Sequence, residues 1–220
     1  MSSICKAALI CIVAAALPSH ADCAPKHVVR IIARVEGLGI EPSSFASLPK
    51  TVFRLGSKYA RIEEAPDTAN KIHGLIVVNE PDSWIINLAD GTGRHVVDQG
   101  PTTNVHIPLF SPGLFDATFP AELAKIEMGC EREFFESYRS PTEPLTSGSI
   151  RKVKQAVGAG KWMLVLVRPE VASPPETLFV FHDHQIAFVV HYVSYDTLAS
   201  DDLAIFEKPK DITFGEASTK

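Results

Sequence analysis

The 220-residue sequence has no excess of positive charge and no hydrophobic run long enough to cross a bilayer. Its 21 lysines and arginines are outnumbered by 26 aspartates and glutamates, which gives a formal net charge of −5. No basic patch stands out, and this argues against nucleic acids and anionic membrane surfaces as main partners. The apolar run at residues 7–17 is shorter than the roughly 20 residues that a membrane-spanning helix needs.

Catalytic signatures are also missing from the sequence. There is no G-x-S-x-G nucleophile elbow, and the Gly-Thr-Gly at residues 91–93 lacks the lysine of a phosphate loop. Glu63 and Glu64 are adjacent on a predicted strand, so they face opposite sides and cannot converge as an acid/base pair. Arg61 and Glu63 share a face, and a surface ion pair is the favoured interpretation. We therefore expect a protein that is not an enzyme and uses no cofactor.

The N-terminus has the pattern of a secretory signal. Lys6 precedes the apolar run, Pro18 ends it, and Ser19 and Ala21 are small residues at positions −3 and −1 of a cleavage site. The sequence predicts a signal peptide at residues 1–21 and a single domain at residues 22–220. An uncleaved anchor is the alternative. We expect an exported, monomeric protein and place it in the periplasm.

Only two of the four cysteines, Cys23 and Cys130, would remain after cleavage. In an oxidising compartment an isolated pair most simply forms one disulfide. Such a bond would tie the N-terminal segment to the region beyond residue 108. Two free thiols are the alternative if the pair lies outside bonding distance.

Residues 51–108 alternate short apolar runs with turn signals, a pattern typical of consecutive antiparallel hairpins. Residues 27–36 fit a helical face as well, but their valines and isoleucines favour a strand. Pro120 and Gly129 bracket a predicted short helix at residues 120–128, which residues 131–138 could continue. The expected strands are 27–36, 51–55, 59–63, 72–78, 83–88, 94–97, 162–167, 177–181 and 186–195, with 203–209 and 212–214 as a last edge strand or plug.

Three stretches together resemble the periplasmic lipoprotein-carrier superfamily, the LolA/LolB-like proteins. They are GSKYARIE at residues 56–63, the paired runs at 75–79 and 84–88, and the closing segment at 195–209. The resemblance implies a mainly β (α+β) fold: an open, strongly curved antiparallel half-barrel with one or two short helices on its concave face. In characterised members of that superfamily, the apolar cavity of the half-barrel holds acyl chains.

Large apolar side chains on the predicted strands are the candidate ligand-binding residues. Plain core packing is the alternative for each of them. If some line a cavity, they would hold a lipid or another apolar molecule without charged groups. The candidates are Phe53, Trp84, Ile86, Trp162, Phe181 and Phe188.

Two further functions remain open. The same sheet could engage a protein of the cell envelope. Less favoured is metal binding by His182 and His184, because a metal site usually needs three or four protein ligands. A polar hairpin tip, with Asp183 as a turn residue, explains these histidines equally well, and no metal ligand is assigned.

Overall fold

The computed structural model describes residues 23–37, 40, 47–98, 105–109, 126–131, 143–144, 150–157, 162–169, 177–215 and 218–219. The predicted signal peptide lies outside these residues and stays a prediction. Within the described ranges, no helix is both long and apolar enough to cross a membrane.

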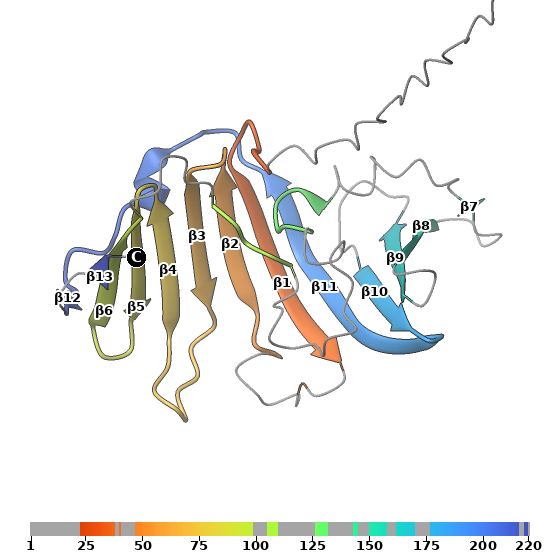
Figure 1. Cartoon of the computed structure of the whole chain (residues 1–220), viewed down its shortest axis with the longest axis horizontal. Helices are drawn as coiled ribbons and strands as arrows, with labels where there is room; N and C mark the ends of the chain where they lie inside the picture. The colour runs from red at the N-terminus through yellow and green to blue at the C-terminus, as the bar shows by residue number, and fades with distance from the viewer. Residues whose placement is uncertain are drawn as a thin grey trace, which may run out of the picture.

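In the described residues, thirteen strands form one open sheet (Figure 1). The order across it is β12-β6-β5-β4-β3-β2-β1-β11-β10-β9-β8-β7, and β13 also pairs with β6. The strands are β1 (Val29–Gly37), β2 (Lys50–Leu55), β3 (Tyr59–Glu64), β4 (Gly74–Asn79), β5 (Asp82–Asn87), β6 (Thr92–Val97), β7 (Glu143–Pro144), β8 (Ile150–Val157), β9 (Trp162–Pro169), β10 (Thr177–His182), β11 (Gln185–Thr197), β12 (Thr213–Phe214) and β13 (Ser218–Thr219).

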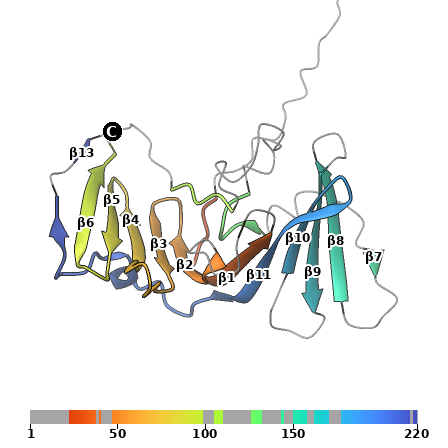
Figure 2. The same cartoon turned by 90° about the horizontal axis from the view of Figure 1, so that it is seen from below.

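Two meanders meet in the middle of the sheet. Strands β1 to β6 pair in sequence order, strands β7 to β11 do the same, and β1 pairs with β11 to join them. All pairs are antiparallel except β12 and β13 with β6, which are parallel. Figure 2 views the central strands almost end-on while the outer strands show their length, as the twist of an open sheet requires. The predicted mainly β, open, antiparallel fold is confirmed.

Local chemistry explains why these segments become strands and turns. In β1, residues Val29, Ile31 and Ala33 are buried and alternate with less buried neighbours, which is the period of a half-buried strand. The strand interpretation of residues 27–36 is therefore confirmed. Asp183 and His184 both have positive φ values, 48° and 67°, and form the tight turn between β10 and β11. The polar hairpin tip is thus confirmed as the conformation of this stretch.

Register assigns the side chains to two faces. The inner face carries Ile31, Val52 and Tyr192, and the outer face carries Phe53 and Trp84. The main core lies on the inner face. There, residues 105–109 cross β2 and β1, and residues 126–131 lie over β11 (Figures 1 and 2). We call these two stretches the crossing segments.

The predicted helix at residues 120–128 is wrong over its described part. Ile126 and Met128 pair with residues 107–109: Leu109 N donates to Ile126 O at 2.8 Å, and Met128 N donates to Ile107 O at 2.9 Å. Ile126 and Met128 are buried and flank the less buried Glu127, so the segment is extended and alternates as a strand does. Residues 120–125 and 132–138 lie outside the described residues.

A smaller core lies on the outer face at the other end of the sheet. Leu75, Val77 and Ile86 are buried there, with Ile212 and Phe214 of the C-terminal segment packed against them. The continuous apolar run at residues 75–78 is accordingly covered on its outer face, while Val78 packs against the inner core.

Candidate functional site

The fully buried Arg54 side chain organises the polar centre of the inner face. Its side chain is 1% exposed, and its guanidinium donates hydrogen bonds to three backbone carbonyls. Nη1 donates to Met128 O at 3.1 Å, and Nη2 donates to Cys23 O at 3.0 Å and Val105 O at 2.6 Å. These carbonyls belong to the N-terminal segment and to both crossing segments, so one side chain of β2 holds all three.

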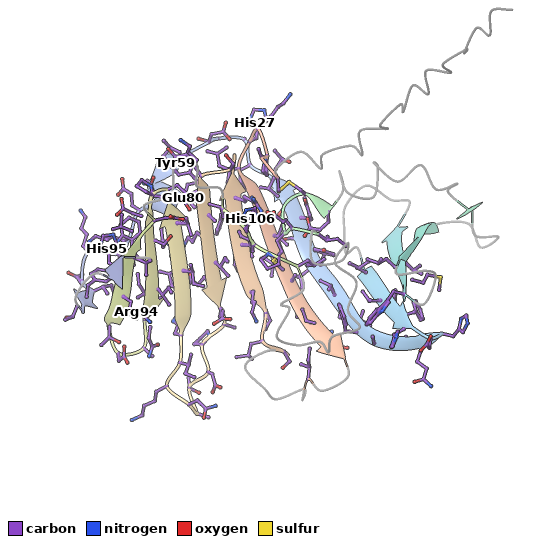
Figure 3. The ribbon with its side chains drawn as sticks, viewed as in Figure 1. His27, Tyr59, Glu80, Arg94, His95 and His106 are labelled. Carbon is purple, nitrogen blue, oxygen red and sulfur yellow. A yellow bond between two sulfur atoms is a disulfide. The ribbon has the colours of Figure 1, made fainter. Side chains whose placement is uncertain are left out.

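Glu127 completes the charge balance of this centre. Its Oε2 lies 2.6 Å from Arg54 Nη1, and its Oε1 lies 2.9 Å from Nδ1 of the exposed His106. Figure 3 shows His106 on the crossing segment in front of β2, well away from His95 on β6. The carboxylate therefore links a buried cation to a histidine at the surface.

A second buried carboxyl group, Glu131, fastens the other crossing segment to β11. Tyr192 Oη donates to Oε1 at 3.1 Å, Tyr195 Oη donates to Oε2 at 3.0 Å, and Gly129 N donates to Oε2 at 2.8 Å. Burial raises the pKa of Glu131 to about 7, although these hydrogen bonds oppose the rise. We call Arg54, Glu127, Glu131, Tyr192 and Tyr195 the polar anchor.

The raised pKa of Glu131 predicts a pH-dependent stability. The folded state holds the proton up to about pH 7 and the unfolded state only up to about pH 4.5. The contribution is therefore complete below pH 4.5 and is lost as the pH rises through 7, with a magnitude of about 3 kcal/mol. Urea denaturation of Glu131→Gln between pH 4.5 and 8 should show this slope removed relative to the wild type.

The exposed Glu207→Gln is the matched control for this measurement, because its carboxyl group is not enclosed. It should leave the slope unchanged. An identical pH slope in Glu131→Gln and the wild type would contradict the assignment.

The predicted disulfide between Cys23 and Cys130 is confirmed. It joins residues 107 positions apart, with 5.7 Å between their Cα atoms. The bond connects two segments that Arg54 also holds, because the guanidinium binds Cys23 O and Met128 O. Covalent and hydrogen-bonded restraints therefore act on the same junction.

The six predicted ligand-binding residues do not share one face. Trp162 and Phe188 are buried in the inner core, and Ile86 is buried in the outer core with Trp84 packed against it. Phe53 and Phe181 are half-buried on the outer face. Trp162 also stacks on His182, with the ring centroids 4.2 Å apart. Only Trp162 and Phe188 therefore lie where the half-barrel interpretation places a ligand.

A shallow hollow lies beside the junction between the N-terminal segment and the turn from β2 to β3. Its volume is about 370 Å³. Gly56 shapes the turn with φ = +57°, and Gly56 N donates to Pro25 O at 2.8 Å. The lining residues are Ala24, Pro25, Lys26, Leu55, Gly56, Ser57, Lys58 and Tyr59.

Ionisable groups on the outer face are engaged with one another. Arg61 lies 3.1 Å from Glu63, as predicted, and Glu63 also lies 3.2 Å from His73. His95 Nε2 lies 2.6 Å from Asp82, and its ring stacks on Trp84. Among the described residues, no three His, Cys, Asp or Glu side chains gather closely enough to hold a metal ion.

Sequence reasoning missed the polar anchor. The sequence does hold a signal for Arg54. It lies two residues after the apolar Val52 on the same strand, so both side chains point to the same, buried face of the sheet. No comparable signal existed for Glu131, because its partners Tyr192 and Tyr195 lie more than 60 residues further along the chain.

Comparisons with known proteins leave the family undefined. No protein-family model and no curated protein matches the chain. One similar solved structure is that of an uncharacterized conserved protein from Thermus thermophilus, at 10% sequence identity and a TM-score of 0.44. The match covers 89% of this chain and 91% of that one. At this level of similarity it bears on neither family nor function, and the LolA/LolB-like resemblance stays a prediction.

Proposed function

We propose that this chain is an exported, non-enzymatic binding protein that holds a lipid or another apolar ligand against the inner face of its sheet. The observation that carries the proposal is the inner face itself. It is apolar from β2 through β1, β11 and β10 to β9, and the described residues over it form two extended crossing segments. Apolar walls of this kind suit acyl chains, which need no charged partner.

The polar anchor supports this interpretation. It fixes the crossing segments through Arg54 on β2 and through two tyrosines near the end of β11. Ile107 and Leu109 hydrogen-bond the other crossing segment through their backbones, and their side chains pack in the inner core. A ligand would enter between the segments and the sheet at these apolar contacts, because apolar contacts re-form around a new apolar surface.

Two further observations fit export and the lack of an enzymatic role. The disulfide is compatible with an oxidising compartment, and we place the protein in the periplasm. The acid and base groups of the outer face pair with one another, and Glu131 is enclosed by its hydrogen-bond donors. Groups paired in this way stabilise the fold. A catalytic acid or base must instead be free to reach a substrate.

Native mass spectrometry of freshly purified protein tests the proposal. We expect a population heavier than the oxidised polypeptide by the mass of a lipid, which solvent extraction removes. Added fatty acid should restore the heavier mass. A mass equal to that of the polypeptide alone, together with no binding of an apolar fluorescent probe, would contradict the proposal.

A further inference from the structure

The segment that follows β11 leaves the central strands and crosses to the far edge of the sheet (Figure 1, blue). We call residues 203–214 the strap. It begins with a short 3₁₀ helix, η4 (Leu203–Phe206), whose N-cap Asp202 accepts a hydrogen bond from Ala204 N at 2.9 Å. Figure 2 shows the strap on one side of the sheet and the crossing segments on the other.

Three apolar side chains hold the strap to the outer face. Phe206 is fully buried, and its ring centroid lies 5.5 Å from that of Tyr59. Ile212 and Phe214 pack against the outer core of Leu75, Val77 and Ile86. The surface under the strap is therefore a row of apolar contacts along β3, β4 and β5.

The sheet has a socket for the Phe214 ring. A Cβ atom added at Gly93 would lie 3.0 Å from Phe214 Cε1 and 3.2 Å from Ile86 Cγ1. A side chain at position 93 would therefore press on the Phe214 ring and on Ile85 O, which lies 3.1 Å from the added atom. Lys208 Nζ lies 5.2 Å from the centroid of the same ring, within range of a cation–π contact.

The backbone of the strap extends the sheet. Thr213 and Phe214 pair in parallel with Thr92 and Gly93 of β6. Thr213 N donates to Gly91 O at 2.9 Å, and Gly215 N donates to Gly93 O at 3.2 Å. This is the geometry by which sheets bind extended peptides: main-chain hydrogen bonds to an edge strand, with alternate side chains in pockets.

The contacts of the strap are concentrated at its two ends. Between its anchors, Glu207, Lys208, Lys210 and Asp211 are exposed. Strand β12 is two residues long, and the chain pairs with β6 again only at the two residues of β13, whereas β3, β4 and β5 each have six residues and a partner on both sides. A segment whose own ladder is this short opens at a lower free energy than the sheet beneath it.

We propose that the strap is a displaceable occupant of a peptide-docking site, formed by the outer face of β3–β5 and the edge of β6. The ligand is an extended segment of a partner protein with an aliphatic-x-aromatic sequence, as in Ile212-Thr213-Phe214. The site lies on the opposite face from the apolar-ligand site and does not depend on it. This surface is where a protein of the cell envelope, the alternative partner considered from the sequence, would bind.

Hydrogen exchange in the full-length wild-type protein tests whether the strap is displaceable. The amides of Thr213 and Gly215 should exchange at least a hundredfold faster, after correction for intrinsic rates, than the amides of β4. Equal protection would mean that the strap leaves only when the sheet unfolds, and would overturn the proposal.

A peptide with the sequence of residues 206–214 tests the site itself. The full-length variant Ile212→Ala/Phe214→Ala should bind this labelled peptide at least tenfold more tightly than the wild type, whose own strap competes at high effective concentration. Gly93→Val in the same variant should abolish binding, and a peptide with alanine at both anchor positions should not bind.

Two results of the peptide experiment would overturn the docking site. One is equal binding of the peptide to the anchor variant and the wild type, with β4 still protected. The other is equal binding with and without Gly93→Val. If the anchor variant fails to fold, hydrogen exchange in the wild type decides the question alone.

Discussion

Arg54→Met is expected to destabilise the protein by about 3–5 kcal/mol, because it removes the fully buried cation that Glu127 pairs with. The substitution also orphans the carbonyls of Cys23, Val105 and Met128. Each buried carbonyl without a donor costs about 1–3 kcal/mol when water cannot reach it. The loss approaches the whole stability of a typical domain, about 5–15 kcal/mol.

Arg61→Met is the matched control, because Arg61 is on the neighbouring strand and pairs with Glu63 at a partly exposed site. Exposed ion pairs contribute about 0–1 kcal/mol, so this variant should stay close to the wild type. Urea denaturation followed by circular dichroism measures both. A loss below about 1 kcal/mol for Arg54→Met would mean that water or other groups replace the guanidinium.

Removal of the disulfide is the second large effect. The Cys23→Ser/Cys130→Ser variant frees a loop of 107 residues, and the chain-entropy relation gives a loss of about 4–5 kcal/mol. Dithiothreitol added to the wild type should produce the same loss. Midpoints of urea denaturation, with and without reductant, measure it.

The two effects should not add. Arg54 and the disulfide hold the same junction, since the guanidinium binds Cys23 O and the neighbouring Met128 O. Without the disulfide, the carbonyl groups that accept hydrogen bonds from Arg54 are held less firmly in place. Arg54→Met should therefore lower the free energy of unfolding by less in the Cys23→Ser/Cys130→Ser variant than in the wild type. Strict additivity across the double-mutant cycle, or unchanged stability of the serine variant, would contradict this account of the junction.

The strands could be predicted because their chemistry is local. The valines and isoleucines at residues 28–35 and the alternating turns of residues 51–97 are visible in any short window of sequence. Strand β8 was missed, since Arg151, Lys152 and Lys154 break its apolar pattern. The sequence predicts residues 126–128 as the end of a helix, because an Ile-Glu-Met triplet fits the spacing of a helix as well as that of a strand. The pairing with residues 107–109 makes the segment extended.

The polar anchor and the grouping of the candidate ligand residues could not be predicted from local patterns. Arg54 is buried because carbonyls 31, 51 and 74 residues away converge on it. The alternation of side chains along one strand separates its two faces. It does not show which residues of the next strand lie on the same face of the sheet, because that depends on the register between the strands. Trp84 and Trp162 are both candidate ligand-binding residues by sequence, and the register places them on opposite faces.

That separation of the two tryptophans makes the central claim directly measurable. Trp84 belongs to the outer core and Trp162 to the inner core, and the sequence has no others. Titration with a dibrominated fatty acid, which quenches tryptophan only on contact, should quench Trp84→Phe strongly, because its remaining tryptophan is on the inner face. Trp162→Phe should be quenched little. Strong quenching of Trp162→Phe with none in Trp84→Phe, or no saturable quenching in either, would contradict binding of an apolar ligand at the inner face.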